Sequence, residues 1–176
     1  YSSLYIHHSR HDIDKFLASR PTLAPNSIGE MYENKQYHPL LDLFEDIAQG
    51  PEDPYSDPEY YQRYVTREKF QQVVVNVMAK AGADALVFPT TQVQSPTREE
   101  LDAGRWKTLE FPTNTLIGAQ TWMPAISVPA GFTAGGVPVG MEILGLPYRE
   151  GDLLALAYAF EQATGHRRAP KSAPEI

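Results

Sequence analysis

A segment in the second half of this chain constrains the fold more than any other. It contains two runs rich in isoleucine, valine and leucine, at 125–132 and 137–146, and such runs predict β-strands. The connection at 133–136 ends in two adjacent glycines, which reach the positive φ angles that a tight turn needs. The segment therefore predicts a β-hairpin. Because proline cannot donate a backbone hydrogen bond, we expect Pro129 and Pro138 at a strand end, an edge or a bulge.

Helices flank this hairpin, and a third strand precedes it. After the hairpin, Leu153, Leu156 and Phe160 recur at helical spacing, and Gly165 marks the expected end of the helix. Upstream, the apolar run at 83–90 predicts a buried strand entered from a helix through a glycine, as is typical of an α/β unit. The predicted fold class is therefore α/β, with a mixed β-sheet covered by helices, of which this chain holds about three strands.

The longest predicted helix covers residues 58–81. Its apolar positions form a broad stripe of aromatic, valine and methionine side chains: Tyr61, Tyr64, Val65, Phe70, Val73, Val74, Val77 and Met78. From Phe70 onward the sequence is nearly apolar all round, so we expect burial on several sides there. A stacking platform of Tyr60, Tyr61 and Tyr64 is the alternative to a stripe that faces a core or a partner.

Shorter helices and one long connection complete the predicted chain. Helical patterns occur near 1–20, 27–36, 40–49, 97–101 and 115–121. The polar connection at 91–108 is about 18 residues long, which exceeds most connections and is typical of functional loops. We divide the chain into a mainly helical segment at 1–82, a strand-loop-helix-hairpin-helix segment at 83–165 and a tail at 166–176.

The charge of the chain argues against several classes of partner. With 15 basic and 22 acidic residues the net charge is −7, whereas binding nucleic acid requires a basic face. The same charge argues against an anionic membrane surface, and no apolar run approaches the roughly 20 residues that span a bilayer. No cysteine is present, which excludes thiolate nucleophiles and cysteine-bound metals. We expect a soluble protein and take the cytoplasm as its location, although the cysteine count does not fix the compartment.

Two histidines near the start, His7 and His11, are four residues apart, as two metal ligands on one helix face would be. The zinc-hydrolase pattern places a glutamate directly after the first histidine, and His8 occupies that position. No distant third ligand is evident in the sequence. We therefore interpret both histidines as exposed or locally bonded, keep a metal hydrolase as an alternative, and expect no metal or organic cofactor.

The sequence offers no activated nucleophile of its own. It lacks a Gly-x-Ser-x-Gly elbow and a Ser-x-x-Lys pair. Ser127 lies between two apolar residues of a predicted strand, and we interpret it as a serine with satisfied hydrogen bonds. Glu142 is flanked by Met141 and Ile143, so its side chain faces opposite to theirs, toward solvent or toward a buried partner.

Four short motifs follow one another in a fixed order in the second half of the chain. They are Pro-Thr-Thr at 89–91, Asn-Thr-Leu-Ile-Gly at 114–118, Pro-Ala-Ile-Ser-Val-Pro at 124–129 and Gly-Val-Pro-Val-Gly-Met-Glu-Ile-Leu-Gly at 136–145. An acidic helix start with Leu153 and Leu154 comes after them. In this order the motifs resemble the C-terminal part of the amidase signature family. The resemblance covers residues 83–164, and the helical region before them is compatible with the same family.

The resemblance implies an enzyme that hydrolyses carboxylic amides through a serine acyl-enzyme. In that family a serine nucleophile, a second serine in a cis peptide and a lysine carry the chemistry, in segments that precede the part matched here. This sequence has no Gly-Gly-Ser-Ser-Gly-like run, and none of its lysines stands in a matching context: Lys15, Lys35, Lys69, Lys80, Lys107 and Lys171. The resemblance therefore implies that this chain holds no catalytic residue and is inactive alone. Its implied partner is the missing N-terminal catalytic portion of the amidase.

The resemblance also implies that this part of the family lines the substrate pocket. By position we nominate six residues: Thr91, Phe111, Asn114, Thr115, Trp122 and Tyr148. The aromatic members suit an apolar acyl or aryl group of a small-molecule amide substrate. Ordinary core packing is the competing interpretation for each residue, and it applies least to Thr91 and Tyr148, which fall in loops.

A different functional class remains open as an alternative. The chain could be a stand-alone, non-catalytic domain that binds a partner or a small molecule. Such a domain is expected to unfold cooperatively and to stay monomeric, whereas one part of a larger enzyme is expected to aggregate or to bind its other part tightly. Association of several copies of the chain is left open.

Overall fold

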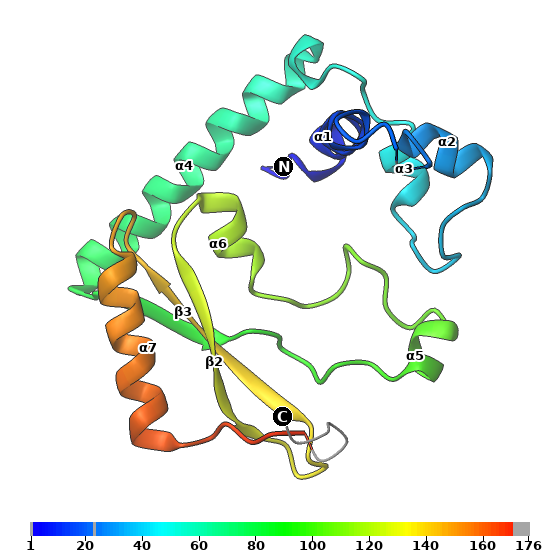
Figure 1. Ribbon diagram of the computed structural model, residues 1–176. Coiled ribbons are helices and arrows are strands. Elements are labelled where there is room, and N and C mark those ends of the chain that lie inside the picture. Colours follow the sequence, from blue (N-terminus) through cyan, green and yellow to red (C-terminus); the bar gives the residue numbers. More distant parts are fainter. Residues whose placement is uncertain (1, 23, 171–176) are drawn as a thin grey trace. The chain divides into compact units, whose positions relative to one another are not determined.

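The computed structural model describes residues 2–22 and 24–170 (Figure 1). Its helices are α1 (Tyr5–Ala18), α2 (Ile28–Glu33), α3 (Phe44–Ala48), the short 3-10 helix η1 (Pro54–Ser56), α4 (Pro58–Ala81), α5 (Arg98–Asp102), α6 (Leu116–Thr121) and α7 (Glu150–Thr164). Its strands are β1 (Ala85–Pro89), β2 (Ala125–Phe132) and β3 (Pro138–Gly145). Every helix and strand predicted from the sequence is confirmed, with differences only at the ends. In the predicted tail, residues 171–176 lie outside the described residues.

The chain divides into two compact units. The first comprises Tyr1–Phe70 and Pro96–Phe111, and the second comprises Gln71–Ser95 and Pro112–Ile176. The long connection predicted from the sequence is therefore shared between them. The division of the chain at residues 82 and 165 stays a prediction.

The first unit has a small core built by short helices. The Ser27 hydroxyl accepts a hydrogen bond from the backbone N–H of Glu30 at 3.1 Å, and this cap starts α2. The carboxylate of Asp14 in α1 accepts the N–H of Ile28 at 2.7 Å, which joins α1 to α2. The buried cluster consists of Ile28, Leu43 and Ile47, with Phe44 packed against it.

The tyrosines near the start of α4 form an aromatic cluster. Tyr60 is buried, and its ring lies edge-on to Tyr55 and Tyr61 with centroid distances of 5.2 and 5.0 Å. These contacts occupy the ring of Tyr60, so it is not a free stacking surface. The structure therefore favours the core interpretation of this residue over a stacking platform.

The second unit is organised by a three-stranded antiparallel sheet in the order β1-β3-β2. The predicted hairpin between β2 and β3 is confirmed, and in its turn the N–H of Gly136 donates to the carbonyl oxygen of Thr133 at 2.9 Å. The register shifts between Pro129 and Gly131, so Pro129 lies at a bulge, and Pro138 is the first residue of β3. The expected positions of both prolines are confirmed, as is the α/β fold class. Both described strand pairs are antiparallel, so the mixed character of the sheet stays a prediction.

Helix α7 covers one face of β2 and β3 (Figure 1). Alternation along the strands turns Val128 and Ile143 to this face, where Leu153 and Ala157 of α7 pack against them. Burial of one large aliphatic side chain contributes about 1.5–3 kcal/mol, so this cluster stabilises the unit substantially. Ala85 at the start of β1 also packs against this cluster, whereas Val87 remains 57% exposed, so the cover does not extend along the whole of β1.

The opposite face of the sheet is approached closely by α6. A Cβ added at Gly118 of α6 would lie 3.0 Å from the Cβ of Ala125 and 3.4 Å from the Cδ1 of Leu144. Leu144 is fully buried. A glycine at position 118 thus lets the helix sit against the ends of β2 and β3 on the face that also carries Glu142.

The predicted bounds of α4 are confirmed, but its predicted burial is not. Val74 and Met78 are buried, whereas Val73 and Val77 are more than half exposed. Residues four apart lie on one helix face, so the described part of α4 after Phe70 buries one face. The expectation of burial on several sides is therefore wrong. Within residues 2–22 and 24–170, no helix has both the length and the apolar character needed to cross a membrane.

Candidate functional site

Two hydroxyl groups from different strands meet above the central strand of the sheet. Thr90 follows β1 and Ser127 belongs to β2, with β3 between them, yet their hydroxyl oxygens are 3.1 Å apart. The space for this contact exists because residue 140 has no side chain. A Cβ at Gly140 would lie 2.8 Å from Oγ1 of Thr90. The predicted role of Ser127, a strand serine with a satisfied hydrogen bond, is confirmed.

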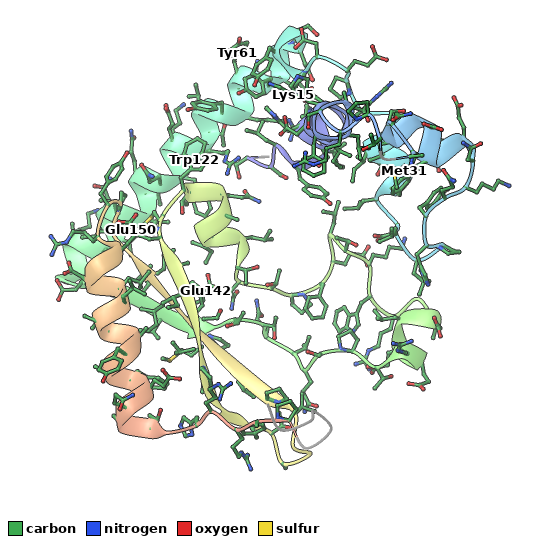
Figure 2. All side chains as sticks on the ribbon, in the orientation of Figure 1. Lys15, Met31, Tyr61, Trp122, Glu142 and Glu150 are labelled. Carbon is green, nitrogen blue, oxygen red and sulfur yellow. The ribbon has the colours of Figure 1, made fainter. Side chains whose placement is uncertain are left out.

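Figure 2 labels Glu142, which lies on β3. Its side chain shares a face of the strand with position 140, because residues two apart lie on the same face. It is only 3% exposed, and its Oε1 has no hydrogen-bond partner among the described residues. Burial raises the pKa of this carboxyl above its ordinary value of 4.5. Of the two alternatives posed by the sequence, the structure selects the buried one, and the described residues supply no partner for Oε1.

Asn114 joins the end of β1 to the start of α6. Its Nδ2 donates to the carbonyl oxygen of Pro89 at 2.7 Å, and its backbone N–H donates to the carbonyl oxygen of Thr90 at 3.0 Å. Its Oδ1 accepts from Nε2 of Gln92 at 3.3 Å. Asn114 therefore has a structural role, because its hydrogen bonds hold the backbone and side chains together where β1 ends.

Thr91 and Thr115 lie close to Asn114 through two local contacts. Thr91 pairs with Thr113 in an isolated antiparallel bridge, and its hydroxyl donates to the carbonyl oxygen of Val93 at 2.9 Å. The hydroxyl oxygens of Thr113 and Thr115 are 2.9 Å apart. Three of the six nominated residues thus come together where β1 ends. Their hydroxyl and amide groups already make hydrogen bonds within the protein, so they can bind a polar ligand only through the donor and acceptor capacity that remains.

Trp122 and Tyr148 lie at the other end of the sheet. Trp122 directly follows α6, and Tyr148 follows β3. The backbone N–H of Gly145 donates to the carbonyl oxygen of Pro124, which joins the end of β3 to the start of β2. Both aromatics have positive φ angles, 54° and 62°, which are uncommon for a residue with a bulky side chain (Figure 2 labels Trp122). Tyr148 is 93% exposed. The structure does not bring these two residues to the end of β1.

Phe111 lines a groove that belongs entirely to the first unit. The groove has a volume of about 540 Å³ and is mainly apolar, with Leu40, Leu101 and Trp106 among its lining residues. The rings of Trp106 and Phe111 meet edge-to-face with centroids 5.7 Å apart. A groove of this size lined by aromatic side chains is typical of small-molecule sites.

One wall of this groove is fixed by Asp42 and Thr108. The carboxylate of Asp42 accepts the backbone N–H of Thr108 at 2.9 Å and its hydroxyl at 2.5 Å. These bonds hold the pKa of Asp42 below its ordinary value of 3.8, the hydroxyl bond most of all. The long connection is thereby tied to a segment 66 residues earlier in the chain.

The histidines predicted as locally bonded each face a carboxylate. Nε2 of His7 is 3.4 Å from Asp57, and Nδ1 of His11 is 3.0 Å from Asp12. The bond from His11 is the main reason why the pKa of Asp12 lies below its ordinary value. In the part of the chain that the structure describes, no three histidine or carboxylate side chains gather as metal ligands would.

Sequence reasoning missed three members of these sites. Thr90 belongs to the Pro-Thr-Thr motif, but position alone singles out the neighbouring Thr91. Trp106 and Asp42 carry no periodic or motif signal. The length of the connection at 91–108 is the available indication that a site could form there.

Comparison with known proteins identifies the family of this chain. A family model described as Amidase matches residues 1–154. A glutamyl-tRNA(Gln) amidotransferase subunit from Ruegeria pomeroyi is 32% identical over 125 residues, which make up 70% of this chain and 24% of that protein. The same subunit from Syntrophobacter fumaroxidans is 51% identical over 55 residues, 31% of this chain and 11% of that protein. The chain therefore spans a quarter or less of these two relatives.

Solved structures with the same fold include two of peptide amidases. A peptide amidase in complex with the competitive inhibitor chymostatin has a TM-score of 0.72 and 25% identity, covering 96% of this chain and 34% of that one. The native peptide amidase from Stenotrophomonas maltophilia has a TM-score of 0.70 and 24% identity, with the same coverage. A 6-aminohexanoate cyclic dimer hydrolase has a TM-score of 0.62 and 22% identity, covering 97% of this chain and 36% of that one.

Proposed function

This chain belongs to the Amidase family, and from that premise we propose that it is the C-terminal part of an amide hydrolase. The observation that carries the proposal is the likeness to a peptide amidase over 96% of this chain but only 34% of that one. An enzyme of that length has room for a catalytic portion beyond these 176 residues. In this arrangement the chain contributes the sheet, its apolar core and a wall of the substrate pocket.

The proposed reaction is hydrolysis of a carboxylic amide through a serine acyl-enzyme. A serine attacks the amide carbonyl, the amine or ammonia leaves, and water then cleaves the ester, while backbone N–H groups stabilise the oxyanion. Ser127 does not fit the role of nucleophile, because its partner is the Thr90 hydroxyl and not a general base. We therefore assign the nucleophilic serine, its second serine and the lysine to the portion outside this sequence.

The six nominated residues remain our proposed substrate contacts. Phe111 has the surroundings best suited to an apolar acyl or aryl group, because Trp106 and two leucines share its groove. Asn114 and its threonine neighbours suit a polar part of the substrate, since amide and hydroxyl groups can both donate and accept. These are separate proposals, one for each unit, and the proposed substrate class is a carboxylic amide.

The names of the two relatives refer to amide transfer on a tRNA. A protein that binds RNA needs basic residues to neutralise phosphates, and this chain has a net charge of −7, so we do not propose that this chain binds the tRNA itself. A rival function is a stand-alone binding domain. The groove beside Phe111 favours it, because one unit of the chain supplies all of its lining residues.

The decisive experiment is the intact mass of every polypeptide in the purified protein under denaturing conditions, followed by an amide hydrolysis assay. We expect a mass larger than that of these 176 residues, or a second polypeptide, with a sequence that includes a lysine segment and a Gly/Ser-rich serine segment. We also expect the protein to release ammonia from primary amides. If the mass matches these 176 residues alone and no hydrolysis occurs, the proposal is wrong. Cooperative unfolding of that monomer would then support the binding domain.

A further inference from the structure

Glu142 is a buried acid whose Oε1 has no partner among the described residues. This oxygen is enclosed and makes no hydrogen bond in the described chain. Burial raises its pKa, and no ion pair with Glu142 is present among residues 2–22 and 24–170. An unpaired buried carboxyl destabilises a fold, and an apolar residue beside Leu144 would avoid this cost. The acid at this position therefore points to a hydrogen-bond donor from elsewhere.

The face of the sheet that carries Glu142 also carries Ser127, whose hydroxyl contacts that of Thr90, and we call these three residues the polar row. In the register of the sheet, Ser127 lies directly opposite Glu142. The bond between Gly145 and Pro124 sets the alternation of the ladder, which makes this a pair without mutual backbone hydrogen bonds. Side chains in such pairs are the closer ones, with Cα atoms about 4.5 Å apart. The carboxyl and the two hydroxyls thus share one small area.

The polar row is open on the side of β2. Strand β2 is an outer strand of the described sheet, and Ser127 is exposed. Because the ladder alternates, the backbone N–H and carbonyl oxygen of Ser127 point away from β3. A segment lying along β2 would meet these backbone groups and the Ser127 hydroxyl together, next to Glu142.

We propose that the polar row binds a hydrogen-bond-donating side chain from the catalytic portion of the enzyme, and that Glu142 is a positioning residue for that portion. This inference rests on the proposed function, which places the nucleophile outside these residues. This chain covers only 34% of peptide amidase, so an enzyme of that length has further chain from which the donor can come. The donor is a cation, because a buried carboxylate needs a compensating charge, and it meets the carboxyl group of Glu142 from the open side of β2.

The test compares Glu142→Leu with Glu142→Gln in the purified protein with all its polypeptides. Leucine suits the buried site but removes the acceptor, whereas glutamine keeps an acceptor oxygen. We expect kcat/KM to fall about tenfold to a hundredfold in the leucine variant, because small misplacements of catalytic groups cost that much. Glutamine should restore at least part of this loss. The matched control is Glu68→Gln, an exposed glutamate of α4, which should leave kcat/KM unchanged.

Equal kcat/KM for the wild type and both Glu142 variants would overturn the inference, because a structural role tolerates leucine at least as well as glutamine. If Glu142→Leu fails to fold, the free energy of unfolding of Glu142→Gln relative to the wild type, measured at several pH values, tests the inference instead. A cation at Glu142 keeps the gain in stability from Glu142→Gln constant between pH 5 and 8, because it holds the carboxyl ionised over this range. A gain that grows with pH means that no cation is bound, and it overturns the inference.

The two proposals fail separately. Absence of amide hydrolysis by the wild-type protein contradicts the proposed function. The pH dependence of the unfolding difference still decides whether a donor occupies the polar row, because it requires no activity.

Discussion

The hydroxyl groups of Thr90 and Ser127 are 3.1 Å apart, although β3 separates the strands from which they come. The contact depends on Gly140, where a Cβ would lie 2.8 Å from the Thr90 oxygen. The residue that carries no side chain therefore determines whether two outer strands can exchange a hydrogen bond.

We expect Gly140→Ala to destabilise the chain by about 1–3 kcal/mol, the usual cost of forcing an extra group into a packed site. The double variant Gly140→Ala with Thr90→Ala should recover part of this loss, since the clashing oxygen is gone. Denaturant unfolding measures both. Gly135→Ala is the matched control, because a Cβ there would lie 3.8 Å from the Thr133 hydroxyl oxygen, an ordinary contact distance. Equal effects at positions 135 and 140 would contradict the steric explanation.

Asn114→Ala should cost about 1–2 kcal/mol of the free energy of unfolding. The change removes two hydrogen bonds: the one that Nδ2 donates to the carbonyl oxygen of Pro89 and the one that Oδ1 accepts from Gln92. Asn76→Ala, at an exposed position in α4, is the control and should be neutral or slightly stabilising through helix propensity. If the two variants have the same stability, the proposed structural role of Asn114 is contradicted.

The stability of this 176-residue chain by itself should fall as pH rises because of Glu142. Its folded pKa is raised above 4.5, so the folded state binds more protons than the unfolded state over that window. The stabilising contribution is complete below about pH 4.5 and is lost as pH rises through the folded pKa. Glu142→Gln should therefore be more stable than the wild type at pH 8 by about 1–3 kcal/mol.

The difference between these two proteins isolates Glu142 from other titrating groups. Asp12, Asp42 and Glu99 have lowered pKa values, and they make stability rise with pH over a more acidic window. Urea unfolding of both proteins at pH 4 and pH 8 measures the difference. A difference that is independent of pH would show that Glu142 is not a buried neutral acid in the lone chain.

Phe111→Ala should weaken the binding of an apolar amide to the first unit. Phenylacetamide is a suitable probe, and loss of a large apolar contact is expected to raise its Kd about tenfold. Leu109→Ala is the control, because Leu109 is exposed and does not line the groove. Calorimetric titration measures both variants. An unchanged Kd in Phe111→Ala would exclude the groove as the site of this probe.

Thr108→Val should raise the pKa of Asp42 toward 3.8, because the hydroxyl bond is the largest cause of its lowered value. Thr108→Ser keeps a hydroxyl and should keep the pKa low. NMR titration of the Asp42 carboxyl carbon follows this directly. The backbone bond from residue 108 remains in both variants, so a complete return to 3.8 is not expected.

Local patterns were sufficient to predict the elements of the sheet. The hairpin at 125–146 combines two apolar runs with a glycine turn, and both signals arise within about ten residues of each other. The order of motifs was enough to identify the family. Burial along α4 was predicted wrongly at Val73 and Val77, because exposure depends on which neighbours cover a helix and not on its own periodicity.

The candidate sites depend on contacts that sequence patterns do not encode. Alternation predicted the side of the strand from which Glu142 projects, but not that this side would be enclosed. Thr90 and Ser127 are 37 residues apart, and Asp42 and Thr108 are 66 apart. Each contact follows only once the register or the path of a long connection is fixed.

The open ladders of the three-stranded sheet have a consequence for handling the protein. An outer strand is a template on which a further copy can add its own strand, so concentrated or warmed samples risk fibrous deposits. Two features shorten the exposed template. Pro129 interrupts the row of donors on β2, and Asn114 occupies the carbonyl oxygen of Pro89 at the end of β1. Loss of either would make the chain harder to keep in solution before it makes it harder to fold.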